Sequence, residues 1–425
     1  MKEKSKLNSN KLLINNNLLF INSEIGRLKR VLLHEPGEEI NNLTPKYLEE
    51  LLFDDIPWLP LAKAEHQVFA KAFKDNGIEV VYLVDLISEV LKDEIVKEEF
   101  IKDFINDLGN IPTHQEKEIY DYLMSIKDSK KLVKKCMSGI KKNELYKDKK
   151  EMKLDDYVNT SIFVTDPMPN LYFTRDPFTI INNGVSINSM YSKTRKRETI
   201  FAKYIFKYHK DYKNTDIYYN RDDKYNIEGG DICVLSDKCL IVGVSERTSA
   251  YAIEKLAHRL FFDFFTSYDT ILAFHIPKAR TFMHLDTIFS QVDYDKFTIH
   301  KSCYDKMEVY ELKKDNISNK IITKKLNKKL ELILEDQLHK KITLIPCGGK
   351  DSINSDREQW SDGSNCFCIA PGVVIAYERN DITNKLLTKH GIKVISIPSS
   401  ELSRGRGGPR CMSMPLYREQ IWEQI

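Results

Sequence analysis

The sequence predicts an α/β protein in which a β-hairpin, a helix and a third strand recur as one module. Hairpin patterns begin at residues 178, 232, 287 and 366, so the intervals are 54, 55 and 79 residues. Helical patterns follow three of these hairpins, and a further strand pattern follows the last. Modules of this kind cannot each bury a core alone, so we expect them to pack radially around an axis.

Composition narrows the class of protein. The 425 residues are 42% hydrophobic and 30% charged, which is enough to bury a sizeable core. The first twenty residues lack a continuous apolar core of signal-peptide length, and no stretch downstream is long enough to span a membrane. A net charge of +3 gives no global field toward nucleic acid. We therefore expect a cytoplasmic protein with neither a membrane nor a nucleic-acid partner.

Cysteine usage excludes two further classes. The eight cysteines include no C-x-x-C pair, so neither a disulfide framework nor a zinc ribbon is indicated. No H-E-x-x-H or similar ligand spacing is present. We expect no metal and no cofactor.

The region before the repeats is predicted to be mostly helical. Residues 61–73 carry apolar side chains at 3.6-residue spacing, and residues 83–108 continue the pattern, which indicates a helical bundle. We divide the chain into an N-terminal part of the repeat architecture (1–40), a largely helical inserted domain (41–155) and the remaining modules (156–425). Two lysine-rich stretches, 141–153 and 313–329, are typical of solvated helix faces or loops.

Each module is predicted from local signals. In the first, strands 178–181 and 185–188 flank Asn182-Asn183-Gly184, where Asn-Gly supplies the positive φ angles of a tight turn, and a helix follows at 198–208. The second pairs 232–235 with 239–244, followed by a helix that begins near Ser245 or Thr248. The third pairs 287–292 with 296–300. The fourth pairs 366–370 with 373–377 and continues into a helix near 384–387 and a strand at 394–397.

Carboxylates and a histidine lie just before equivalent strands. Asp176 precedes the first hairpin, Glu228 and Asp231 the second, and His284 and Asp286 the third. In a radial array these positions face one another across the axis, so we expect them to share one cavity. A buried cluster of negative charge is costly unless a cation fills it. Asp231 could equally be a turn or cap residue.

Cys411 is the candidate nucleophile. It follows a glycine-rich loop containing Arg404, Arg406 and Arg410, where the backbone can approach closely and positive charge favours a thiolate. A single cysteine is more often a buried small hydrophobe, so the loop carries the prediction. His284 could serve as general acid and base. The carboxylates suit a guanidinium, whose planar N–H donors match pairs of oxygens.

Four segments together resemble the arginine deiminase family of guanidino-group-modifying enzymes: residues 168–178, 226–231, 283–287 and 407–415. The resemblance extends from Gly26 to Pro415. It implies a five-module, pentein-like α/β propeller with a helical domain inserted early, in which the strand around Val31 joins the C-terminal segment. It also implies hydrolysis of free L-arginine by water to L-citrulline and ammonia. We further expect a homo-oligomer.

The same resemblance assigns roles. It implies that Cys411 attacks the guanidinium carbon to form an amidino-thioether, that His284 is the acid and base, that Asp176 and Asp286 grip the guanidinium, and that Glu228 supports them. The positions that match substrate-binding residues are Asn170, Phe173, Arg195, Arg247 and Arg406. Arg197 lies two residues from Arg195, so either could hold the substrate carboxylate.

Other functions predict different sequences. An agmatine deiminase of the same fold would lack two carboxylate-binding arginines, and an amidinotransferase would exclude water from the covalent intermediate. A papain-like peptidase places its cysteine before its histidine, whereas here Cys411 follows His284. A propeller used only for binding would have lost at least one of Asp176, His284, Asp286 or Cys411, and all four are present.

Overall fold

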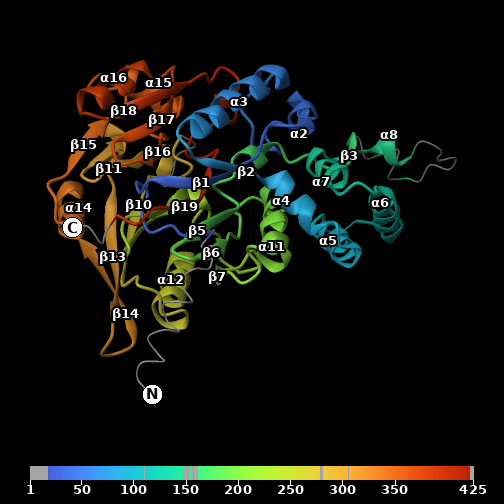
Figure 1. Cartoon of the computed structure of the whole chain (residues 1–425), viewed down its shortest axis with the longest axis horizontal. Coiled ribbons are helices and arrows are strands. Elements are labelled where there is room, and N and C mark those ends of the chain that lie inside the picture. Colours follow the sequence, from blue (N-terminus) through green and yellow to red (C-terminus); the bar gives the residue numbers. More distant parts are fainter. Residues whose placement is uncertain are drawn as a thin grey trace.

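In this computed structural model the chain adopts an α/β fold of several small sheets (Figure 1). The structure describes residues 18–109, 111–146, 154, 158, 161–277, 281–304 and 306–421. Within these ranges none of the sheets closes into a barrel. No helix in the same ranges is long and apolar enough to cross a membrane.

Five sheets of the described chain share one pairing rule. The first strand pairs antiparallel with the second, and the second pairs parallel with the third. These sheets are β5 (Phe178–Ile181), β6 (Gly184–Ile187) and β7 (Ile217–Tyr219); β8 (Ile232–Val234), β9 (Cys239–Val244) and β10 (Thr270–His275); β11 (Phe289–Asp293), β12 (Lys296–Ile299) and β15 (Thr343–Pro346); β16 (Phe367–Ala370), β17 (Val373–Tyr377) and β18 (Lys393–Ile397); and β19 (Met414–Arg418), β1 (Leu28–Leu33) and β2 (Glu79–Tyr82).

The four predicted hairpins are confirmed, and so are the helices predicted after three of them. These helices are α11 (Thr199–Tyr208), α12 (Ala250–His258) and α16 (Asp381–Lys389). The Ser249 hydroxyl caps α12 by accepting a hydrogen bond from the amide of Ala252 at 3.3 Å. Serine at this position satisfies an amide that has no partner within the helix, which explains why α12 begins here.

The turn of the first hairpin differs from the prediction. Asn182 adopts the left-handed conformation at φ 51°, and Gly184 is already the first residue of β6, paired with Ile181. The turn is therefore Asn182-Asn183, and the prediction that Asn-Gly forms it is wrong. Gly184 has another reason to be glycine, because a Cβ there would lie 2.3 Å from the ring of Tyr218.

Helices dominate residues 59–145, as the apolar spacing predicted. Two strands interrupt them. β2 pairs parallel with β1, because the short segment after α3 returns to the sheet, and β3 (Ile140–Lys141) pairs antiparallel with β4 (Phe163–Thr165). The α4–α8 helices lie toward one end of the molecule (Figure 1). The helices are α3 (Leu59–Asp75), α4 (Leu83–Val90), α5 (Glu94–Asn106), α6 (Thr113–Ser125), α7 (Ser129–Ser138) and α8 (Lys142–Leu145).

The lysine-rich segment at 313–329 is a β-hairpin, so its prediction as helix or loop is wrong. β13 (Glu308–Asp315) pairs antiparallel with β10, and β14 (Lys320–Leu326) forms the outer edge. Val309 and Leu312 are buried, which explains why β13 adds to the sheet. Lysines along β14 discourage pairing of this edge with another strand. The other lysine-rich segment, 141–153, lies partly outside the described residues.

Candidate active site

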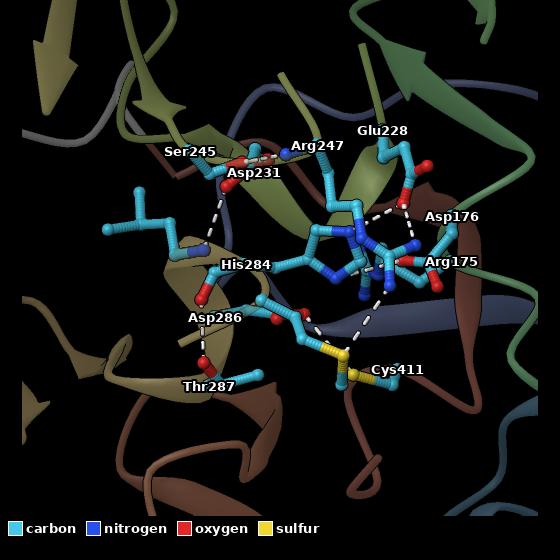
Figure 2. A network of polar contacts seen from close by, with 12 residues as sticks. Arg175, Asp176, Glu228, Asp231, Ser245, Arg247, His284, Asp286, Thr287 and Cys411 are labelled. Atoms are coloured by element: carbon cyan, nitrogen blue, oxygen red, sulfur yellow. Dashed lines mark hydrogen bonds and ion pairs between the residues drawn. The ribbon is translucent and has the colours of Figure 1, made fainter. Parts of the chain in front are cut away.

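Four of the predicted catalytic residues lie on short turns that precede the first strands of different sheets (Figure 2). Asp176 precedes β5, Glu228 precedes β8, His284 precedes β11 and Cys411 precedes β19. This shared placement brings residues distant in the sequence into one buried cluster.

Two adjacent glycines allow these turns to meet. A Cβ on Gly230 would lie 2.6 Å from Nδ1 of His284, and a Cβ on Gly229 would lie 1.9 Å from the carbonyl oxygen of Arg175. Neither approach is possible for a residue with a side chain. The Gly229-Gly230 pair therefore allows the imidazole of His284 to lie against the turn that carries Glu228.

His284 is held by carboxylates on two sides. Its Nε2 lies 2.7 Å from Oε2 of Glu228, and its Nδ1 lies 3.7 Å from Oδ1 of Asp176. Burial alone would lower the pKa of His284, but Asp176, Glu228 and Asp231 raise it to about 9. Burial would raise the pKa of Glu228, but Arg247 and His284 hold it below its ordinary value. The pair is therefore an imidazolium and a carboxylate near neutral pH.

Asp176 and Asp286 have similar surroundings. Oδ2 of Asp176 accepts a hydrogen bond from Nη1 of Arg195 at 2.7 Å, and Oδ2 of Asp286 accepts one from Nη1 of Arg410 at 2.8 Å. Both side chains are buried. The Oδ1 atoms of both aspartates are buried and accept no hydrogen bond from any described residue. A buried carboxylate oxygen of this kind offers a place for a donor from a ligand.

Cys411 lies beside Asp286. Its Sγ is 3.6 Å from Oδ2 of Asp286, and its amide donates to Oδ1 of Asn365 at 3.0 Å. Burial raises the pKa of the Cys411 thiol well above its ordinary value, and Asp286 and Asp176 raise it further. The thiol is therefore protonated before a substrate binds.

This protonation differs from the expectation that the nearby arginines favour a thiolate. The Arg410 guanidinium is engaged by Glu24 and Asp286, at 3.2 and 2.8 Å. The Arg404 guanidinium pairs with Asp55. Their positive charges are thus balanced by carboxylates and only partly offset the burial of the thiol.

The cluster borders a cavity of about 30 Å³, which is room for one or two waters. Eight of the ten predicted site residues line it, and Glu228 and Asp286 lie behind them. Asn170 donates from Nδ2 to the carbonyl oxygen of Leu51 at 2.7 Å. The lining residues predicted from the sequence are Asn170, Phe173, Asp176, Arg195, Arg247, His284, Arg406 and Cys411.

Arg195 and Arg197 point to different surroundings. Arg195 lines the cavity and is held by Asp176 and Glu198, with its Nη2 2.9 Å from Oε2 of Glu198. Arg197 donates to the carbonyl oxygen of Asp166 and lies over the ring of Phe104, and it does not line the cavity.

Two more arginines complete the lining. Arg247 lies 3.8 Å from Oε2 of Glu228 and donates to Sδ of Met283 (Figure 2). The Arg406 guanidinium lies 3.4 Å from the ring centroid of Trp360 and 3.5 Å from Asp54. Arg406 has φ 64°, so a non-glycine residue adopts the left-handed conformation next to the nucleophile loop.

Three supporting residues were missed or left open by sequence reasoning. Asn365 joins the Cys411 amide to the carbonyl oxygen of Asp286, and it could have been found because it directly precedes the fourth hairpin. Glu198, whose pKa burial raises to about 7, gave no such signal. Asp231 accepts from Ser245 Oγ and from the amide of Leu285, at 2.7 and 2.9 Å, and so fixes the turn that carries His284.

Known proteins resemble this chain in both sequence and fold. A family model described as arginine deiminase matches residues 49–418. The chain is 51% identical over 407 residues to an arginine deiminase of Clostridium perfringens, with 95% of this chain and 98% of that protein covered. It is 52% identical over 408 residues to an arginine deiminase of Borreliella burgdorferi, with 95% and 98% covered.

Solved structures show a similar fold at low sequence identity. An amidinotransferase of saxitoxin biosynthesis from Microseira wollei superposes with a TM-score of 0.54 at 12% identity, covering 95% of this chain and 98% of that one.

Proposed function

This chain belongs to the arginine deiminase family, and we propose that its buried cluster hydrolyses free L-arginine to L-citrulline and ammonia through a covalent intermediate on Cys411. One observation carries the proposal. Two buried aspartates, each with an oxygen that accepts no hydrogen bond from a described residue, lie beside a thiol and an imidazolium. This arrangement can bind a cation and attack it in the same place.

The two free oxygens are suited to a guanidinium. Arg195 and Arg410 already occupy the Oδ2 atoms of Asp176 and Asp286, which leaves the Oδ1 atoms for the N–H groups of a substrate. Guanidinium presents its donors in one plane and matches carboxylate oxygens closely. Its charge would offset the cost of keeping these carboxylates ionised away from water.

Binding of this cation would also activate the nucleophile. Asp286 and Asp176 both raise the pKa of the Cys411 thiol. A guanidinium between them adds positive charge next to the sulfur and lowers that pKa, because a nearby opposite charge favours the ionised form. The thiol proton is released to solvent as the substrate settles, so only a protein with bound substrate carries the reactive thiolate.

The chemistry then proceeds in two halves. The Cys411 thiolate adds to the guanidinium carbon, the imidazolium of His284 gives its proton to the departing nitrogen, and ammonia leaves an amidino-thioether. Neutral His284 next takes a proton from water as the oxygen adds to the same carbon. The carbon–sulfur bond then breaks as the added oxygen becomes the carbonyl of citrulline, and the hydroxyl proton passes to the departing sulfur, which restores the Cys411 thiol. Glu228 holds the His284 ring in position throughout, from 2.7 Å.

The remaining lining residues are suited to the other end of the substrate. We assign Arg247 and Arg195 to the α-carboxylate, Asn170 to the α-amino group and Phe173 to packing against the side chain. Arg195 lines the cavity and Arg197 does not, which favours Arg195. Arg195 also pairs with Asp176, so the residue assigned to the substrate's α-carboxylate contacts the residue assigned to its guanidinium.

Arg406 is suited to control entry. A cavity of about 30 Å³ cannot admit arginine, so part of its wall must move. Arg406 lines this cavity and also an outer cavity of about 390 Å³, where Trp360 and Asp54 contact it. Movement of the Arg406 side chain would join the two spaces.

The fold supports an assembly of modules. We propose that the five sheets with a common pairing rule are the modules of a five-module propeller, with β1 and β2 completing the one that contains β19. We also propose the division into 1–40, 41–155 and 156–425. β2 falls within 41–155, so the inserted domain returns one strand to the first part.

We propose that the protein is cytoplasmic and forms a homo-oligomer. All eight cysteines are buried free thiols, as suits a reducing cytoplasm. We propose that identical subunits assemble, which light scattering on the purified protein would test.

Substrate assays test the function directly. Purified protein is incubated with arginine or with agmatine, and citrulline and ammonia are measured. We expect turnover of arginine and, after acid quenching, a substrate-derived mass on the peptide that holds Cys411. The control is Cys411→Ala. Comparable turnover of agmatine, or turnover by the control above a trace, contradicts the proposal, and transfer of the amidino group to an added amine instead of water indicates an amidinotransferase.

A further inference from the structure

The turn before β16 has no role in the chemistry described so far. The turns before β5, β8, β11 and β19 each carry a predicted catalytic residue, whereas this turn carries none of the predicted site residues. Asn365 lies on it, two residues before β16, as Asp176 lies two residues before β5. The Asn365 side chain is buried. The repeated position therefore places a neutral amide where the other sheets place charged or reactive groups.

The side chain of Asn365 joins the nucleophile to one of the two aspartates assigned to the guanidinium. Its Oδ1 accepts from the amide of Cys411 at 3.0 Å, and its Nδ2 donates to the carbonyl oxygen of Asp286 at 3.0 Å. A backbone amide can only donate and a carbonyl can only accept, so the two partners fix the orientation of the side-chain amide. A carboxylate at this position would lack the donor, and an alkyl group would lack both.

The loop that carries the nucleophile also lies against the backbone of Asn365. The carbonyl oxygen of Asn365 accepts from the amide of Arg410 at 3.2 Å. A Cβ on Gly408 would lie 2.8 Å from the same oxygen, so this close approach needs glycine. The Arg410 guanidinium is a second link from the loop to Asp286, but it lies at the end of a long side chain. Asn365 acts on the Cys411 amide itself.

The two joined turns differ in their other anchors. The Asp286 turn is also held by Asp231, which accepts an amide hydrogen bond from it at 2.9 Å. The backbone of Cys411 is held at its carbonyl oxygen by the amide of Arg175 at 3.1 Å, and at its amide by Asn365. Loss of the Asn365 side chain should therefore displace the sulfur more than the Asp286 carboxylate.

We propose that Asn365 is a positioning residue that sets the distance between the Cys411 sulfur and the guanidinium carbon of the bound substrate. Its two hydrogen bonds span from the nucleophile to Asp286, whose Oδ2 lies 3.6 Å from Sγ. Attack needs the reacting atoms about 3–3.5 Å apart, and a displacement of about 1 Å can slow such a step about a hundredfold. The inference rests on the proposed function and adds to it a residue that touches neither the substrate nor the transferred proton.

Asn188 provides a matched control. It is also buried, and its Nδ2 donates to the carbonyl oxygen of Asp176 at 2.7 Å, as that of Asn365 donates to Asp286. Its Oδ1 accepts from a serine hydroxyl of β6 and not from the nucleophile loop. Alanine at either position removes a bond to the carbonyl of an aspartate assigned to the guanidinium. Only Asn365→Ala also releases the Cys411 amide.

Steady-state rates and single turnovers test the proposal. Wild type, Asn365→Ala, Asn365→Asp and Asn188→Ala are compared by kcat and KM for arginine, and the rate of adduct formation on Cys411 is measured by acid quenching with protein in excess. We expect kcat and the rate of adduct formation of both Asn365 variants to fall about tenfold or more below those of Asn188→Ala, because the sulfur is displaced. Asn365→Asp keeps the shape of the side chain and loses only the donor, so it tests the link between the turns even if the alanine variant does not fold.

The affinity for arginine separates positioning of the sulfur from damage to the site. Arginine is titrated by calorimetry into Cys411→Ala and into Cys411→Ala/Asn365→Ala, and the two Kd values should agree within about twofold, because the contacts that bind the substrate remain. A loss of affinity as large as the loss of kcat, or equal kcat in Asn365→Ala and Asn188→Ala, would overturn the role of Asn365 alone. Wild-type protein that forms neither citrulline nor an adduct would overturn the proposed function, and this inference with it.

Discussion

Replacing Glu228 with glutamine tests whether this carboxylate sets the proton affinity of His284. The variant keeps the size of the side chain and an oxygen that can accept from the amide of Tyr191, but it removes the negative charge 2.7 Å from Nε2 of His284. Despite burial, which lowers it, the pKa of His284 is raised to about 9 by Asp176, Glu228 and Asp231. We expect that pKa to fall in the variant.

The size of the fall follows from the bond that is lost. A hydrogen bond between charged groups contributes about 1.5–3 kcal/mol, against about 1 kcal/mol for a neutral one. The difference is on the order of 1.4 kcal/mol, which corresponds to a tenfold change in proton affinity. The pKa of His284 should therefore fall to about 8. Because the first half of the proposed reaction needs the imidazolium, activity should be lost about one pH unit earlier on the alkaline side.

The free energy of unfolding should also depend on pH through the protonation of His284. The pKa of His284 in the folded protein lies above its ordinary value of 6.5, so its contribution is fully present below pH 6.5 and is lost as pH rises to about 9. In the wild type this loss is on the order of 3 kcal/mol. In Glu228→Gln it should be on the order of 2 kcal/mol, because the upper pKa is lower.

Two measurements check this reasoning. Initial rates of citrulline formation at low arginine give kcat/KM from pH 6 to pH 10, and urea unfolding gives the stability at pH 6 and pH 9. Glu254→Gln, at an exposed position of α12, is the matched control. If kcat/KM falls at the same alkaline pH in Glu228→Gln and in wild type, the role given to Glu228 is refuted.

Three further predictions address the substrate. Asp176→Asn or Asp286→Asn should lower kcat/KM at least tenfold, because each loses a charge-assisted bond worth about 1.5–3 kcal/mol; a value within twofold of wild type excludes that aspartate from binding the guanidinium. Arg247→Leu should reduce the preference for arginine over agmatine at least tenfold, because it lowers kcat/KM for arginine and not for agmatine. An unchanged ratio of the two kcat/KM values contradicts the role of Arg247. Trp360→Ala should lower KM for arginine about fivefold, because the lost stack, worth about 1 kcal/mol, holds Arg406 in the closed wall of the cavity. Trp360→Phe should stay near wild type, and equal KM values in both variants would refute the role of the stack.

The hairpins and the turns of the candidate site could be predicted because their signals are local. Alternating apolar residues around polar turns identify strands without knowledge of their partners. The recurrence of these patterns then placed Asp176, Glu228 and His284 at equivalent positions. Their convergence follows from repetition alone, and the structure shows the His284–Glu228 and His284–Asp176 contacts that result.

The rest depends on partners that no local pattern identifies. Arg410 was expected to promote a thiolate, but Glu24 and Asp286 engage it from distant segments. The segment around Lys320 forms strand β14 because it pairs with β13, which in turn pairs with the edge of β10. Glu198 looks like an ordinary helix-start residue in the sequence, and only the folded chain shows that it holds Arg195.

The pairing of β1 with β19 has a consequence for how the protein is made. Cys411 lies shortly before β19, and β19 pairs with β1, which is synthesised far earlier. Contacts between such distant segments form late, because closing a long loop costs entropy before any contact is gained. A growing chain on the ribosome can therefore fold its helices and early hairpins, but it has no positioned thiol. We therefore expect a chain to acquire activity only after β19 has been synthesised and has paired with β1.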